Sequence, residues 1–203
     1  MWVIPVSITP SDSDKQFIEA ELRKTIEKLG PGIDSLQINF EEIMSEWQGV
    51  KQKGSGKSSK EVEFAALSES TKDGPVILYL HGGAYFMCSP DTHRDMTYHI
   101  AKACDGRVFS LKYRLAPEHP FPAALVDAIL AYKYLIDPPA GALHKPIDPS
   151  QIVIAGDSAG VTHPFSRFML IVGWFNFCVN AIPGPFRSSV PFACRDYWNV
   201  TLA

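Results

Sequence analysis

The stretch that most constrains the fold of this chain is the pentapeptide GDSAG at residues 156–160. It directly follows an apolar run, residues 152–155, that is typical of a buried strand. A serine flanked by glycines at such a place is typical of a tight strand-to-helix turn that lifts the hydroxyl out of a sheet. The glycines are needed because the turn is strained and neighbouring backbones come too close for side chains. The sequence therefore predicts that Ser158 is exposed in a tight turn at the end of a strand.

Apolar periodicity predicts strands that alternate with helices over most of the chain up to this turn. We expect strands at 61–67, 76–80, 107–111 and 151–155, and helices at 11–29, 40–47, 89–104 and 123–136. The run at 76–80 is continuously apolar, which is expected of a strand covered on both faces. This alternation indicates a parallel sheet of the doubly wound type.

Two further motifs follow expected strands. The first is HGGAY at residues 81–85, which is either a glycine turn or a loop whose backbone N–H groups stabilise an oxyanion. The second is YRLAPEHPFPAA at residues 113–124, a proline-rich connection. Within it, we expect Arg114, Glu118 and His119 to form a structural polar cluster.

In this order and spacing, the three motifs resemble those of the hormone-sensitive-lipase-like group of α/β-hydrolases, which are carboxylesterases and lipases. The resemblance implies a carboxylic ester hydrolase that acts on a small acyl ester and uses no cofactor or metal. It implies the nucleophile Ser158, oxyanion N–H groups from Gly83, Ala84 and Ala159, and a loop shape that depends on His81 and Gly82.

The resemblance also implies a division of the chain and a fold class. We expect a partial α/β-hydrolase fold, with a mostly parallel, doubly wound sheet and an N-terminal helical cap segment. Residues 1–58 would form the cap-like segment and a linker, and residues 59–160 the N-terminal part of the hydrolase domain. Residues 161–203 would form an atypical, aromatic-rich tail, in which only 4 of 43 residues are charged.

The chain departs from the family pattern after the pentapeptide. Family members place a catalytic acid and a histidine on loops far beyond the 45 residues that follow Ser158 here, where His163 and Asp196 are the only candidates. A serine hydroxyl is a poor nucleophile without a base. We therefore expect a truncated chain with crippled activity, and the alternative is a non-catalytic isoform or a small-molecule-binding pseudoenzyme of the same fold.

Composition narrows the partners and the compartment. A net charge of −3 and the lack of a basic stripe argue against nucleic acid as a partner. The four cysteines form no CxxC pair, which argues against a zinc site or a disulfide framework. The N-terminus has no signal-peptide pattern, so a cytoplasmic location is expected. A membrane anchor at residues 168–179 stays a minor alternative, because that apolar run is short for a span.

Overall fold

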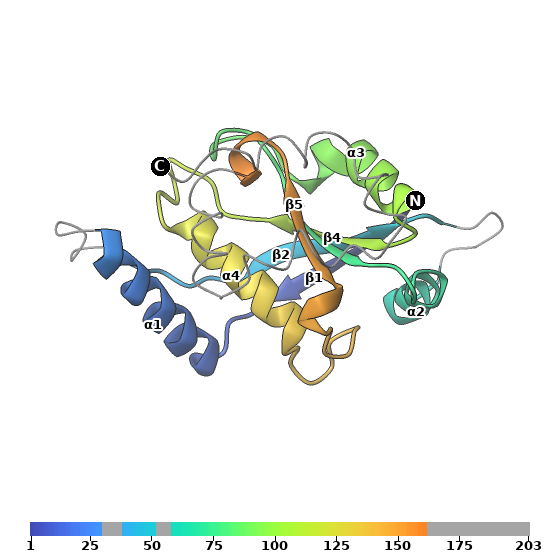
Figure 1. The fold of residues 1–203 in the computed structure, drawn as a ribbon, viewed down its shortest axis with the longest axis horizontal. Helices are drawn as coiled ribbons and strands as arrows, with labels where there is room; N and C mark the ends of the chain where they lie inside the picture. The colour runs from blue at the N-terminus through green and yellow to red at the C-terminus, as the bar shows by residue number, and fades with distance from the viewer. Residues whose placement is uncertain (30–37, 52–57, 162–203) are drawn as a thin grey trace.

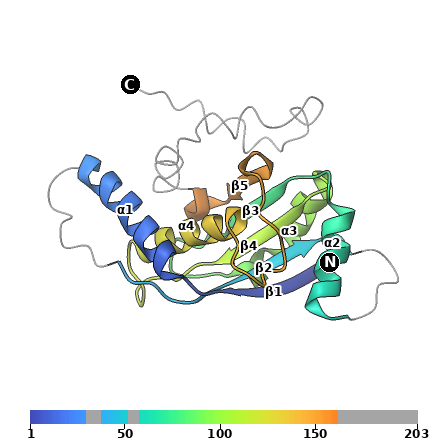
Figure 2. The same cartoon turned by 90° about the horizontal axis from the view of Figure 1, so that it is seen from below.

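A computed structural model describes residues 1–29, 38–51 and 58–161 of the chain. In these residues the centre of the fold is a five-stranded sheet with the strand order β1-β2-β4-β3-β5 (Figure 2). The strands are β1 Trp2–Ile8, β2 Ile43–Gly49, β3 Val76–Leu80, β4 Arg107–Lys112 and β5 Ile152–Gly156. The sheet is mixed, since β4, β3 and β5 run parallel to one another whereas β1 and β2 add antiparallel pairs.

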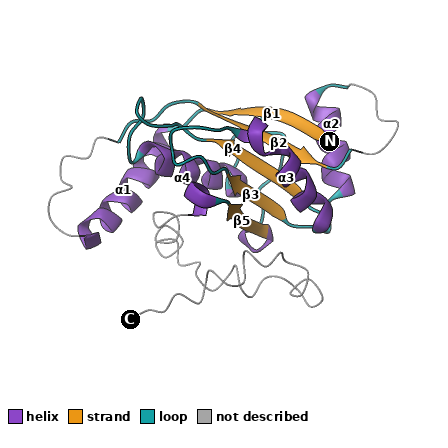
Figure 3. Ribbon diagram, turned by 90° about the horizontal axis from the view of Figure 1, so that it is seen from above, coloured by secondary structure: helices purple, strands orange, loops and turns teal. Residues whose placement is uncertain are grey.

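Helices cover both faces of the sheet. They are α1 Asp12–Leu29, α2 Lys60–Ser70, α3 Pro90–Ala103 and α4 Ala123–Ile136. Helix α3 lies on one face, whereas α4 and α1 lie on the other (Figure 1). Helix α2 lies at the end of the sheet near the start of β1 (Figure 3).

Strand β3 is buried on both faces, as its apolar run predicts. Ile77 and Tyr79 pack against Ala101 of α3, whereas Leu78 and Leu80 belong to the larger core cluster that contains the apolar face of α4. The expected strands at 107–111 and 151–155 and the helices at 11–29, 89–104 and 123–136 are confirmed within one or two residues. The doubly wound arrangement around the parallel strands is confirmed as well.

Two of the expected elements are wrong in type. Residues 40–47 are not a helix, because β2 pairs with β1 on one side and with β4 on the other. Trp47 of β2 is fully buried, with ring centroids 5.2 Å from Phe64 and 4.7 Å from Phe109. Residues 61–67 are not a strand but lie in α2, where Phe64 and Leu67 are buried at the three-residue spacing of one helix face.

The N-terminal segment also differs from the expected helical one. Besides α1 it contributes β1 and β2 to the main sheet. Residues alternate between buried and more exposed along β1, with Pro5 on the exposed side. A proline is tolerated in a strand at the edge of a sheet, and β1 is the outermost strand of the described sheet on that side. The role of α1 as part of a cap stays a prediction.

A buried ion pair joins α4 to the proline-rich connection. The guanidinium of Arg114 lies 2.7 Å from the Asp127 carboxylate, and the Arg114 backbone N–H donates to the same carboxylate at 2.8 Å. Arg114 and His119 both contact Glu41, at 3.3 and 3.5 Å. Two of the three expected members, Arg114 and His119, therefore lie in one polar cluster, but the acids in it are Glu41 and Asp127 in place of the expected Glu118.

None of the helices in the described residues combines the length and the apolar character that a transmembrane span requires.

The buried histidine His144 makes the stability of this fold depend on pH. Its Nε2–H donates to the Tyr134 carbonyl at 3.1 Å, and its ring packs edge-on against Trp47. Burial, helped by the nearby Arg107 cation, lowers the pKa of His144 from 6.5 to about 4. His144 therefore takes up a proton near pH 6.5 in the unfolded chain but only near pH 4 in the folded chain. Protonation favours the unfolded state, so the free energy of unfolding falls as the pH is lowered from 6.5 to 4.

We expect the free energy of unfolding to fall by about 1–2 kcal/mol between pH 7 and pH 5 because of His144. Urea unfolding at the two pH values measures this loss. The His144→Phe variant should show a flatter pH dependence, whereas the exposed control His99→Gln should keep the parent slope. An unchanged slope in His144→Phe would contradict the assignment.

Candidate functional site

Ser158 lies in a strained turn at the carboxyl end of β5. Its φ is +45°, in the left-handed region that non-glycine residues rarely adopt. The residue is exposed, and a short 3₁₀ turn, Ser158–Val161, follows it. The Gly160 N–H closes this turn on the Asp157 carbonyl at 2.8 Å. The pentapeptide thus forms a tight turn that presents a serine at the edge of the sheet.

The two glycines of the pentapeptide are required by the neighbouring strand β3. A Cβ at Gly156 would lie 2.5 Å from the Leu80 carbonyl oxygen, and a Cβ at Gly160 only 1.9 Å from the same atom. Both distances are far below van der Waals contact, and the obstacle is backbone, which cannot rotate away. The turn after β5 therefore rests directly on the end of β3.

The segment at 81–85 leaves β3 at the same edge, because parallel neighbours end together: Leu80 pairs in register with Gly156. Three consecutive residues have positive φ, namely Gly83 at 116°, Ala84 at 52° and Tyr85 at 66°. The Gly83 carbonyl accepts hydrogen bonds from the backbone N–H groups of residues 86 and 87, each at 3.1 Å. The segment is therefore a tight, left-handed loop beside the turn that carries Ser158.

Two hydrogen bonds connect this loop to the serine turn. The Gly82 N–H donates to Asp157 Oδ1 at 2.9 Å, and the Tyr85 hydroxyl donates to the Ala159 carbonyl at 2.6 Å. The first contact depends on glycine, because a Cβ at Gly82 would lie 2.1 Å from Asp157 Oδ2. The expected site residues are thus brought together: Ser158 and Ala84 are exposed, Gly83 is half-buried and Ala159 is buried.

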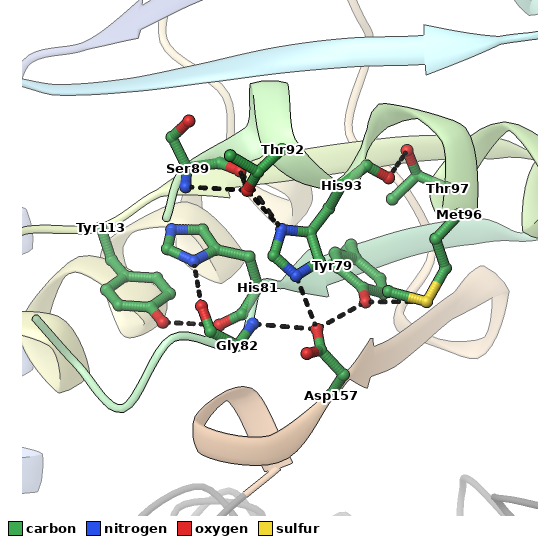
Figure 4. A network of polar contacts seen from close by, with 10 residues as sticks. All are labelled: Tyr79, His81, Gly82, Ser89, Thr92, His93, Met96, Thr97, Tyr113 and Asp157. Atoms are coloured by element: carbon green, nitrogen blue, oxygen red, sulfur yellow. Dashed lines mark hydrogen bonds and ion pairs between the residues drawn. The ribbon is translucent and has the colours of Figure 1, made fainter. Parts of the chain in front are cut away.

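Asp157 is the centre of a network that sequence reasoning missed (Figure 4). Its Oδ1 also accepts from the Tyr79 hydroxyl at 2.7 Å and lies 3.4 Å from Nε2 of His93. Burial and this hydrogen bond raise the pKa of Tyr79 far above its ordinary value, so its hydroxyl stays a donor. The signal available in the sequence was the charged residue beside the serine, but its partners come from β3 and α3.

His81 supports the loop from the interior. It is fully buried and stacks on Tyr113, with ring centroids 4.2 Å apart and planes 12° apart. Its Nδ1 donates to the Gly82 carbonyl at 2.7 Å, and the Tyr113 hydroxyl donates to the His81 carbonyl at 2.5 Å. Burial lowers the pKa of His81, so the ring is neutral at pH 7. His81 therefore fixes the start of the loop from the interior of the fold.

Within residues 1–29, 38–51 and 58–161, no group of three or more His, Cys, Asp or Glu side chains is arranged to hold a metal ion.

The contact of Gly160 with Leu80 gives a direct test of this geometry. Gly160→Ala should lower the free energy of unfolding by about 2–3 kcal/mol, since backbone must move to admit the methyl group. The control is Gly141→Ala, where φ is +88° but a Cβ would meet nothing within 4 Å, so only the backbone strain of about 1 kcal/mol is expected. Urea unfolding compares the two, and equal losses would speak against the close approach.

Comparisons with known proteins agree with this architecture. Residues 77–162 match a family model described as the alpha/beta hydrolase fold. The chain is 42% identical over 89 residues to the Acetyl-hydrolase of Streptomyces hygroscopicus and 44% identical over 90 residues to Esterase LipI of Mycobacterium tuberculosis. Each alignment covers 44% of this chain and 27% of the relative. The chain thus spans little more than a quarter of the length of these relatives.

Solved structures include similar chains as well. EstE5 with PMSF is 35% identical, and the match covers 70% of this chain and 41% of EstE5 with a TM-score of 0.42. An esterase from the bacterial hormone-sensitive lipase family is 30% identical, with coverages of 75% and 50% and a TM-score of 0.41. Over residues 77–162 the chain is therefore similar to α/β-hydrolases, and the relatives that it resembles are named as an acetyl-hydrolase and an esterase.

Proposed function

We propose that this chain carries the nucleophile and the oxyanion-binding part of a carboxylic ester hydrolase. In this mechanism Ser158 Oγ attacks the acyl carbonyl carbon, and the carbonyl oxygen gains negative charge. Backbone N–H groups of Gly83, Ala84 and Ala159 stabilise that oxygen. The alcohol then leaves, and water releases the acid from the acyl-serine. The observation that carries the proposal is an exposed Ser158, at φ +45°, beside a left-handed glycine loop.

The base that would activate Ser158 is not evident among the described residues. Five of the six histidines lie there, and each has a partner other than Ser158. His81 donates to the Gly82 carbonyl and His144 donates to the Tyr134 carbonyl. His93 and His119 contact carboxylates, and the exposed side chain of His99 lies 3.8 Å from that of Asp95. The sixth, His163, and the acid Asp196 lie outside the described residues. We therefore propose that turnover by this chain is very low.

The same observation favours a second candidate function. A chain that keeps the loop at 81–85 and the serine turn, but has no base for Ser158, can bind an ester or a related small molecule without hydrolysing it. In that case the chain is a non-catalytic, small-molecule-binding member of the family.

A fluorophosphonate probe tests the role of Ser158 directly. We expect slow labelling of the parent chain and none of Ser158→Ala, because the proposed oxyanion donors are present while no described histidine is bonded to Ser158. The loss of a triad histidine leaves roughly 10³- to 10⁴-fold catalysis over water, so hydrolysis of p-nitrophenyl butyrate should be near background. Ser150→Ala, an exposed serine before β5, is the matched control and should label like the parent.

The outcomes separate the candidates. Labelling that persists in Ser158→Ala would overturn the nucleophile assignment. Fast labelling with robust turnover would show that a base is present, and the chain would be a working esterase. A folded parent chain that never reacts would leave the binding function.

A further inference from the structure

The loop at 82–85 and the turn at 157–159 are connected at two points that bracket the reacting groups. Gly83 and Ala84 lie between Gly82 and Tyr85, while Ser158 lies between Asp157 and Ala159. Gly82 is bonded to Asp157, and Tyr85 is bonded to Ala159, at 2.9 and 2.6 Å. The residues joined by these two cross-links are 75 and 74 positions apart in the sequence.

The first cross-link is itself held in place from two other elements. Tyr79 Oη, from β3, and His93 Nε2, from α3, both lie against the same carboxylate oxygen that Gly82 uses (Figure 4). The other ring nitrogen of His93 lies 2.8 Å from Thr92 Oγ1 and 3.3 Å from the Ser89 carbonyl. The His93 side chain is only 14% exposed. The carboxylate of Asp157 therefore has a fixed orientation before any substrate arrives.

The second cross-link is supported from the proline-rich connection. The backbone N–H of Ala116 donates to the Tyr85 carbonyl at 2.8 Å, which fixes the backbone of the residue whose hydroxyl reaches Ala159. Tyr85 has φ +66°, a conformation that costs free energy and so needs contacts of this kind to persist.

We infer that Asp157 and Tyr85 are positioning residues that set the distance between the Ser158 hydroxyl and the backbone donors of Gly83 and Ala84. This inference rests on the proposed function. An oxyanion donor acts only when it lies about 2.7–3.1 Å from the developing charge, and a displacement of about 1 Å can cost about 10²-fold in rate. Two short hydrogen bonds on either side of the pair hold it within that tolerance.

The variants that test the inference change one cross-link at a time. Tyr85→Phe keeps the ring and removes the bond to Ala159. Asp157→Ala removes the acceptor, whereas Asp157→Asn keeps a carbonyl oxygen for Gly82 and should rescue. Tyr98→Phe and Asp95→Asn on α3 are the matched controls, since they make the same chemical changes away from the loop.

The first readout is hydrogen exchange of the Gly82 amide, measured by NMR on uniformly ¹⁵N-labelled protein. We expect exchange to become about five- to tenfold faster in Asp157→Ala, which is the effect of one lost hydrogen bond, and to stay within about twofold of the parent in Asp157→Asn. Amides of β3 and β4 should not change, which separates a local release from global destabilisation. Unchanged Gly82 exchange in a folded Asp157→Ala would overturn the first cross-link.

The second readout is the rate of fluorophosphonate labelling of Ser158. We expect Tyr85→Phe and Asp157→Ala to label about tenfold more slowly at saturating probe with little change in the probe concentration for half-maximal rate, since a misplaced donor affects the transition state. Equal rates in Tyr85→Phe and Tyr98→Phe would overturn the positioning role.

The two proposals fail in different ways. If the parent chain is never labelled, the ester-hydrolase proposal fails, and the two cross-links then have no role in catalysis. The Gly82 exchange measurement still decides whether the hydrogen bond to Asp157 holds the loop. If the parent is labelled and the variants match it, the nucleophile stands and the positioning inference fails. If Asp157→Ala does not fold, Tyr85→Phe decides the matter.

Discussion

The approach of two backbones at the carboxyl ends of β3 and β5 is the constraint on which the candidate site depends. The Leu80 carbonyl occupies the space where side chains at 156 and 160 would otherwise be, so the turn is pressed against the neighbouring strand. That contact brings the loop after β3 and the serine after β5 to the same edge of the sheet. Without two glycines the strands could pair in register, but the turn could not close where it does.

The sheet supplies the rigidity that this arrangement needs. Strand β3 is the inner strand between β4 and β5, and its side chains enter separate apolar layers under α3 and under α4. Tyr79 belongs to both the core and the polar network, since its ring is buried against α3 while its hydroxyl donates a hydrogen bond to Asp157. Side chains of the core thus extend directly into the polar network beneath the serine. A change in the core layer under α3 would therefore be transmitted to the orientation of a carboxylate.

The elements that sequence reasoning found are those with strong local signals. The continuous apolar run of β3, the proline-started helix α3 and the apolar helix α4 need no distant partner to be identified. The sequence of β1 shows little polar–apolar alternation, because Val3 and Pro5 on its more exposed side are apolar as well. Residues 40–47 are predicted as a helix because Phe40, Ile43 and Trp47 also fit helical spacing. What decides β2 is pairing on both sides, which only the fold provides. The site shows the same limit: GDSAG and HGGAY mark the two loops, but the bonds of Asp157 and Tyr85 join residues far apart in sequence.

Pro5 lies in the outermost described strand and affects whether another copy of this protein can pair with that edge of the sheet. An edge strand exposes a row of backbone donors and acceptors that can template the addition of another strand. Proline has no N–H to offer, so the ladder that a second chain would need along β1 is interrupted near its middle. The antiparallel extension made by β1 and β2 thus ends the sheet on this side with a strand poorly suited to further pairing, which disfavours edge-to-edge aggregation there.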